Sequence, residues 1–543
     1  MNVLTVSISG RLNGQNAVLV CGGLDLAGNL DIPVIVSGGM FWNSGTAASI
    51  KILPSGFLRM DSGFPKAMAD LSLLENFGSV IHASGDFHIY YTERFRDFTH
   101  VINHGTWAMI AGPTTVVTSF LNRQHFYNKG TFHVTAPEGA VPPDVLFGGI
   151  FHNTGIIRVD VARFRVTNTL ILENECRVTG SGMVLGTGPS SSAIEASGNI
   201  NIGEVGGKGT ITLAKDSRLR CGTEAFPVTT FHTHGSGKFD WVGGNIVGAL
   251  DLGVNSRTFI SGPDVKDMDP VHEPNGAPAS LINNGTVEWT GSGNIHRGEE
   301  GKFLNHFSGT FIVDTDADMI ALPFSRTSGR VENRGTLRKI SGAAGEMTEI
   351  LHGTFLNSGV LDIQSGVLRM NCDYTIGTPA NLIGAGKTVW AGNGTLWGDL
   401  KISNGGSFEL AGGGCGFSTL TDGMPSGVLR TINGGNFLWT GGGIGGVFEV
   451  SSDSIVTVGG TAVKAINTRS RFINRGSFLW NGGTIALQGN DGDGPTFENR
   501  GLFRANGQAL LFDGGAYSSS RFLIRHIGHW RSFRDFQHQL DVL

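Results

Sequence analysis

Three aspartates at alternate positions are the residues of this sequence best suited to bind a metal ion. Asp314, Asp316 and Asp318 form the run DTDAD, and alternate side chains of a β-strand point to the same side. Three carboxylates on one side would offer the hard oxygen ligands that calcium prefers. The run lacks the glycine and the distal glutamate of an EF-hand loop. It therefore predicts either a calcium site of another type or a set of solvated carboxylates, and no other cofactor is expected.

Two further polar groups could bind ligands. His232 and His234 form a His-x-His pair that would bind a transition metal if a third ligand joined it. The segment 261–280 is the most polar and proline-rich loop candidate, and long loops on a rigid scaffold often carry binding sites. A solvated loop is the simpler interpretation of this segment. Its ionisable residues are Asp264, Asp267, Asp269, His272 and Glu273.

An Asn-x-Gly corner recurs along the chain and predicts the elements that would position these side chains. Twelve strict copies occur, and Thr233 and Asn305 stand at the Asn place of two variant copies. Many neighbouring copies lie 22–29 residues apart. Self-similarity at this length is typical of a solenoid, in which each unit is too small to bury its own apolar face. The strict copies begin at Asn43, Asn76, Asn103, Asn128, Asn153, Asn283, Asn333, Asn357, Asn404, Asn433, Asn474 and Asn499.

Apolar and polar residues alternate on both sides of each corner. Two places before the Asn lies an apolar residue in thirteen of the fourteen copies, including Phe126, Phe151 and Phe355. Alternation with a period of two is typical of strands with one buried face. We therefore predict that these rings point inward and form a column, and that the Asn amides hydrogen-bond along the stack. The corner Gly is expected to adopt a positive φ, which glycine tolerates best.

A second signature is a tryptophan followed by a glycine-rich turn. It occurs at Trp241, Trp289, Trp390, Trp439 and Trp480. The positions of three of these residues after a corner Asn favour packing in the core over stacking against a sugar. A coil of roughly 25 residues with short strands suits an all-β, right-handed parallel β-helix solenoid of about twenty coils.

The repeat pattern sets the expected domain organisation. We predict a β-helix over residues 1–517, with interruptions at 61–75 (one short helix), 136–149 and 261–280. From residue 518 apolar residues recur at steps of three and four, which predicts a capping helix or an irregular tail over 518–543. The start of the chain lacks the features of a secretory signal, so we expect a piece of a larger protein with further coils.

The composition limits the classes of function. The 84 glycines punctuate apolar strands, and 34 Phe against 5 Tyr suit a dry interior. The net charge of −5 and the scattered basic residues make nucleic acid an unfavoured partner. The five cysteines form no close pairs, which predicts buried free thiols. No stretch is long and apolar enough to span a membrane, and no nucleophile elbow, phosphate-binding loop or zinc-protease motif occurs.

The repeats resemble those of very large secreted bacterial proteins. The runs HGTFLNSGVLDIQSGVLRM (352–370) and LWGDLKISNGGSFELAGGG (396–414) carry the resemblance, which covers about residues 20–515. They are similar to units of filamentous-haemagglutinin-like and autotransporter-passenger β-helices. This resemblance implies a pectin-lyase-like fold and placement outside the cell or on its surface. The chain carries no recognisable secretion domain or sorting tail, so export is implied by the resemblance alone.

These observations favour a non-enzymatic, extracellular or cell-surface β-helix that acts as an elongated stalk or adhesin-like passenger. Glycans or surface proteins would be its partners. The alternative is a polysaccharide lyase or glycoside hydrolase on the same scaffold. Such an enzyme would bring outward carboxylates and basic residues from three neighbouring coils into one groove. A third hypothesis, a trimeric tail-spike-like fibre, has the least support.

Overall fold

The computed structural model of the chain consists of strands and the turns between them. Its described part falls into two compact units, Met1–Ser280 and Leu281–Leu543, and each is described by itself. No helix long and apolar enough to cross a membrane occurs in this part. The described residues are 5–13, 18–69, 71–89, 100–110, 116–119, 125–136, 144–186, 193–205, 207–223, 225–268, 278–298, 300–321, 329–343, 345–417, 427–489, 494–505, 509–513 and 520–524.

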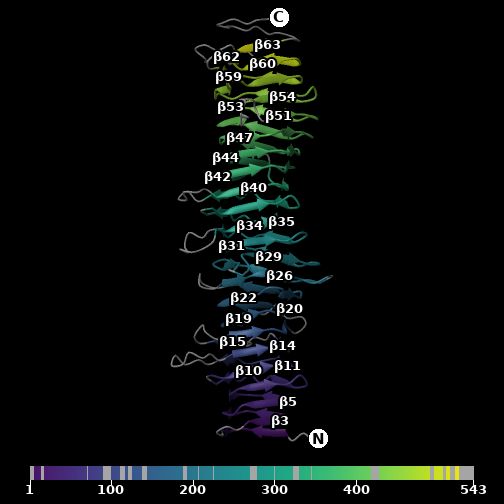
Figure 1. Cartoon of the computed structure of the whole chain (residues 1–543), viewed down its shortest axis with the longest axis vertical. Coiled ribbons are helices and arrows are strands. Elements are labelled where there is room, and N and C mark those ends of the chain that lie inside the picture. Colours follow the sequence, from purple (N-terminus) through teal and green to yellow (C-terminus); the bar gives the residue numbers. More distant parts are fainter. Residues whose placement is uncertain are drawn as a thin grey trace. The chain divides into compact units, whose positions relative to one another are not determined.

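In the first unit most coils contribute three short strands, while in others two sides join into one long strand, as in β31 (Gly244–Leu252), which pairs with both β28 (Arg218–Cys221) and β29 (Val228–Thr233). One three-stranded coil consists of β16 (His125–Asn128), β17 (Thr131–Thr135) and β18 (Asp144–Phe147), and the next of β19 (Ile150–Asn153), β20 (Ile156–Asp160) and β21 (Arg163–Val166). The pairs β16–β19, β17–β20 and β18–β21 are parallel. Figure 1 shows such strands lying one above another as successive rungs. This arrangement confirms the predicted parallel β-helix solenoid.

The second unit repeats the same arrangement. Its strands β37 (Lys302–Asn305), β40 (Arg330–Asn333) and β42 (Met347–Asn357) pair in parallel, and the corner asparagines of all three are register partners. Later in the unit, β57 (Arg471–Asn474) pairs with β60 (Thr496–Asn499) in the same way. Both units therefore stack equivalent corners directly above one another.

The corner asparagines form buried ladders of hydrogen bonds. Nδ2 of Asn103 donates to Oδ1 of Asn128 at 2.7 Å, and Nδ2 of Asn128 donates to Oδ1 of Asn153 at 2.6 Å. Nδ2 of Asn103 also donates to the carbonyl of Thr131 at 3.1 Å, so each amide joins two coils. A buried amide needs such partners, because an unsatisfied polar group costs about 1–3 kcal/mol. The predicted Asn stacking is confirmed from Asn76 to Asn153, from Asn283 to Asn357 and between Asn474 and Asn499. It is wrong at Asn404 and Asn433, which are exposed and adopt positive φ values of 52° and 50°.

Most corner glycines serve a different purpose from the predicted one, although Gly45 has the predicted positive φ, at 89°. Gly105 and Gly130 do not belong to the residues with positive φ. A Cβ on Gly105 would lie 2.0 Å from the carbonyl oxygen of Gly78, and a Cβ on Gly130 would lie 2.1 Å from that of Gly105. Glycine is required here because the coils approach closely, since no real Cβ sits so near a carbonyl oxygen.

Aromatic rings fill the interior in columns, as predicted. Phe126, Phe151 and Phe355 are all buried, whereas Phe41, which also lies two places before a corner Asn, is 43% exposed and contradicts the prediction. The rings of Phe126 and Phe151 stack with centroids 5.0 Å apart and planes 9° apart. The five tryptophans of the glycine-turn signature are buried as well, which confirms core packing. The indole N–H of Trp439 donates to the carbonyl of Gly442 at 3.2 Å, so the ring also holds the turn that follows it.

Two segments differ from expectation. The predicted helix over 61–75 is wrong, because the described residues there include β9 (Lys66–Met68) and β10 (Leu73–Asn76). Strand pairing also continues beyond residue 517, since β63 (Arg521–Ile524) pairs with β60. The remainder of the expected capping helix, 525–543, lies outside the described residues.

Buried lysines reinforce several turns of the solenoid. Lys66, Lys266 and Lys464 have no exposed surface. Nζ of Lys464 donates to the carbonyls of Gly460 and Ala462, and Nζ of Lys266 donates to that of Gly262 at 2.8 Å. In each case the ammonium reaches the carbonyl four residues earlier, so it supplies a donor to a turn that has few backbone partners. The buried lysine thus helps to fix the shape of the turn.

His82 gives the first unit a predictable response to acid. Its Nε2 donates to the carbonyl of Gly85 at 2.7 Å, and burial lowers the pKa of His82 from 6.5 to about 4. The unfolded chain therefore binds a proton more readily than the folded chain. Stability is full above the unfolded pKa and falls as the pH drops from 6.5 to 4, by about 3 kcal/mol for this residue.

We expect the His82→Gln variant to lose much of this pH dependence, because glutamine stays neutral and can still donate to Gly85. Urea unfolding of both proteins at pH 7.5 and pH 4.5 measures the difference. An equal loss of unfolding free energy in the two proteins would show that other groups cause the acid response.

Candidate functional site

A polar cleft of about 740 Å³ lies on the outer surface of the first unit. Its walls come from the same turn in three successive coils. The segment 214–217 precedes β28 (Arg218–Cys221), the segment 242–243 precedes β31 (Gly244–Leu252), and the segment 261–265 precedes β33 (Lys266–Met268). The strands are in register, with Arg218 beside Asn245 and Asn245 beside Asp267. The cleft therefore crosses three neighbouring rungs.

The cleft exists because the middle turn is short. Four residues separate the strands in the first coil and five in the third, whereas only Val242 and Gly243 separate them in the second. A Cβ on Gly243 would lie 2.9 Å from the Asp264 side chain, and a Cβ on Gly244 would lie 2.3 Å from the carbonyl oxygen of Ser217. The glycines let the middle turn recede, so the longer turns stand out on either side as walls.

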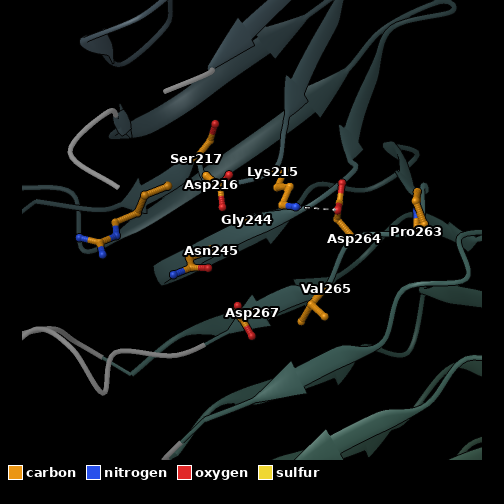
Figure 2. A pocket seen from close by; sticks show the side chains of 10 residues that line it. Lys215, Asp216, Ser217, Gly244, Asn245, Pro263, Asp264, Val265 and Asp267 are labelled. Atoms are coloured by element: carbon orange, nitrogen blue, oxygen red, sulfur yellow. Dashed lines mark ion pairs between the residues drawn. The ribbon is translucent and has the colours of Figure 1, made fainter. Parts of the chain in front are cut away.

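Charged groups face each other across this depression. Nζ of Lys215 lies 3.7 Å from Oδ1 of Asp264, and Figure 2 shows these two side chains pointing toward one another. Asn245 and Asp267 lie on adjacent strands at the other side of the same space. The lining carries Lys215 and Arg218 against Asp216, Asp264 and Asp267. Acidic and basic groups are thus nearly balanced.

The buried ammonium of Lys266 brings the net charge around the cleft closer to zero. Lys266 follows the third turn, and the carboxylates of Asp264 and Asp240 act on its ammonium. Burial lowers the pKa of Lys266 to about 8, while these two carboxylates oppose the shift. Asp240 is itself held by Ser261, whose Oγ donates to it at 2.6 Å. The polar wall of the cleft is therefore tied to the core of the coil.

The structure places the predicted polar cluster of 261–280 at this cleft in part. Asp264 and Asp267 line it, whereas Asp269, His272 and Glu273 lie outside the described residues. The predicted His-x-His pair is divided between different partners. His232 contacts Oδ1 of Asn199 at 3.3 Å, and His234 contacts Oδ1 of Asn201 at 3.1 Å.

The three aspartates proposed for calcium lie in a turn and not on a strand. Residues 314–318 join β38 (Thr310–Val313) to β39 (Met319–Ala321). Oδ1 of Asp316 accepts from the buried ammonium of Lys339 at 2.8 Å, and Oδ1 of Asp318 accepts from the backbone N–H of Glu349 at 2.8 Å. Calcium binding by Asp314, Asp316 and Asp318 stays a prediction. Across the described ranges, no group of three His, Cys, Asp or Glu residues is placed to hold a metal ion.

Sequence patterns identified only part of this site. Lys215, Asp216 and Arg218 do not belong to any motif, and Asn245 lies in the signature after Trp241, which did not indicate a site. These four residues become neighbours only through the stacking of three coils. The available signal was the contrast in turn length, with the two-residue turn after Trp241 between two longer ones. The five cysteines were predicted correctly as free thiols, and all are buried.

Comparison of the chain with protein-family models, with curated proteins and with solved structures finds no match. The candidate site therefore has to be interpreted from its own geometry.

Proposed function

We propose that the chain is a non-enzymatic β-helix that binds a neutral oligosaccharide segment in the cleft of its first unit. The observation that carries the proposal is the convergence of Arg218, Asn245 and Asp267 on three adjacent rungs. A volume of about 740 Å³ falls within the range of small-molecule sites. The lining is polar, so it suits a ligand that is rich in hydroxyl groups.

The charge of the cleft narrows the class of glycan. Three acidic side chains face two basic ones in the lining, and the ammonium of Lys266 lies beneath. A polyanion such as a uronate polymer would meet unfavourable carboxylates there. Sugar hydroxyl groups both donate and accept hydrogen bonds, so they can bond to carboxylate, amide and guanidinium groups at the same time. A neutral sugar chain is the best fit.

The resemblance of the repeats to those of large secreted bacterial proteins supports glycan binding outside the cell. We infer an extracellular or cell-surface protein of adhesin-like type, in which the solenoid holds the cleft on a rigid scaffold. Surface proteins are the second class of partner.

Glycoside hydrolysis is the second candidate function, and a specific observation favours it. The cleft brings carboxylates and basic residues from two of its three coils together beside a longer turn, which is part of what such an enzyme requires. Hydrolysis also needs two carboxyl groups on either side of the scissile bond. Asp264 is engaged by Lys215, which favours a binding role for this carboxylate. A lyase acting on uronates is disfavoured by the acidic lining.

Binding to immobilised neutral glucans, mannans and xylans tests the proposal. We expect the Asp267→Asn and Asn245→Ala variants to bind about tenfold more weakly, because each loses hydrogen bonds worth about 1–2 kcal/mol. The control is Asp31→Asn, which alters a surface carboxylate that pairs with Arg11 in the same unit. Release of new reducing ends would identify a hydrolase, and absence of binding to every glycan would contradict the proposal.

A further inference from the structure

A strip of histidine and tyrosine side chains lies on the outer face of the first unit, away from the residues that line the cleft. His100 lies on β13 (His100–Asn103), His125 and Tyr127 on β16, and His152 on β19. The register places His100 beside His125 and Tyr127 beside His152. Three successive rungs therefore align these rings on a rigid parallel sheet.

Two imidazoles of the strip share one short contact. Nδ1 of His125 lies 2.8 Å from Nε2 of His152. On the far side of His152, Nδ1 lies 3.7 Å from Oε1 of Glu173. At this distance the carboxylate makes no hydrogen bond, but its charge favours a proton on Nδ1 of His152 and leaves Nε2 as the nitrogen with a lone pair. A carboxylate behind a histidine is the arrangement that orients imidazole ligands in metal sites.

Neighbouring rings hold this pair in place. The ring of Tyr127 stacks on His152 with centroids 4.5 Å apart, and His125 lies parallel to Tyr127 at 5.7 Å. His100 meets the edge of His125 at 5.9 Å. The His152 side chain is 17% exposed and Glu173 is 43% exposed, so solvent reaches the pair.

We propose that His125 and His152 bind one copper(II) or nickel(II) ion, with Glu173 as the positioning carboxylate and solvent in the remaining positions. Metal–nitrogen bonds of about 2.0 Å at a right angle place two ligand nitrogens about 2.8 Å apart, whereas a tetrahedral zinc site needs about 3.3 Å. The observed 2.8 Å matches the right angle of tetragonal copper and nickel sites.

Binding requires modest rearrangement and no redox step. The proton of His125 moves from Nδ1 to Nε2, so that both nitrogens of the pair present lone pairs, and small rotations of the rings aim them at one point. Each imidazole binds a metal ion through a deprotonated ring nitrogen, so the affinity is expected to fall at acidic pH.

Titration of the full chain with copper(II) at pH 7.5 tests the inference. Calorimetry and electron paramagnetic resonance monitor the titration. We expect one equivalent with nitrogen hyperfine coupling that is lost in both His125→Gln and His152→Gln. The Glu173→Gln variant should still bind one copper(II) ion, with about tenfold to hundredfold weaker affinity. His104→Gln is the matched control, since His104 stacks on Phe77 elsewhere on the same unit.

Two results would overturn the inference. One is an unchanged copper stoichiometry and spectrum in the His125→Gln/His152→Gln double variant. The other is a higher affinity for zinc than for copper at this equivalent. Circular dichroism and the unfolding midpoint of each variant must match the parent protein, so that loss of metal binding is not loss of fold. Because the strip lies outside the cleft, failure here leaves the glycan assay unaffected.

Discussion

Replacing Phe151 by alanine is expected to lower the free energy of unfolding of the first unit by about 3–5 kcal/mol. Phe151 has no exposed surface, and its ring is enclosed on several sides. It stacks on Phe126 at 5.0 Å and meets Phe132 at 4.9 Å between centroids. Phe147 and Phe164 approach it at 5.2 Å and 5.4 Å. Truncation would leave a cavity between rungs that the register of the strands prevents from collapsing.

The effect of Phe151→Ala is measured by urea unfolding followed by far-ultraviolet circular dichroism, with hydrogen exchange to locate it. Faster exchange is expected first in β16, β19 and the following strand β22 (Thr169–Leu172). The matched control is Phe64→Ala in the same unit, because Phe64 is 67% exposed and its loss should change stability by less than about 0.5 kcal/mol. Equal stability of the two variants would contradict an inward aromatic column.

This column is the part of the fold that the sequence predicted best. The corner Asn and the apolar place before it recur in many coils, so local alternation and the repeat indicate the same inward face. Phe126, Phe151 and Phe355 follow this rule. The prediction succeeded because a parallel stack forces equivalent residues into equivalent surroundings.

Features that break the repeat were less predictable. The cleft depends on the different lengths of three turns. Lys215 and Asp264 meet across the glycine turn that follows Trp241, and the tryptophan–glycine signature marks this turn without indicating that it is recessed. DTDAD alternates like a strand, yet Lys339 pairs with Asp316 and the segment forms a turn. The contact of His125 with His152 joins non-equivalent positions of adjacent rungs, so it follows from ring orientation and not from spacing.

Loss of one corner amide is the second change with a large expected effect. Asn333 in the second unit accepts from Nδ2 of Asn305 at 2.7 Å and donates to Oδ1 of Asn357 at 2.7 Å. It also donates to the carbonyl of Val360 at 3.1 Å, and it is 1% exposed. Asn333→Ala removes a donor and an acceptor from the middle of a buried ladder.

Two neighbouring amides would lose partners at once in this variant, so we expect a loss of about 2–5 kcal/mol in unfolding free energy. Asn393→Ala, an exposed change in the same unit, should be nearly neutral. Asn333→Thr should fall between them. In the first unit Thr233 stands at the corner position that Asn occupies elsewhere, and its Oγ1 accepts a hydrogen bond from the N–H of Arg257 at 2.8 Å. A hydroxyl can therefore make a hydrogen bond between coils at this position.

The outcome of the Asn333 series separates two explanations of the recurrent asparagine. If the residue only shapes the corner, Asn333→Ala and Asn393→Ala would differ little, and exchange at the N–H groups of Gly335 and Gly359 would stay slow. If the ladder ties the rungs together, both N–H groups should exchange faster in Asn333→Ala, because each donates across the rung to a carbonyl of a corner Asn: Asn305 for Gly335 and Asn333 for Gly359. The continuous chain of amide contacts across Asn305, Asn333 and Asn357 favours the second result.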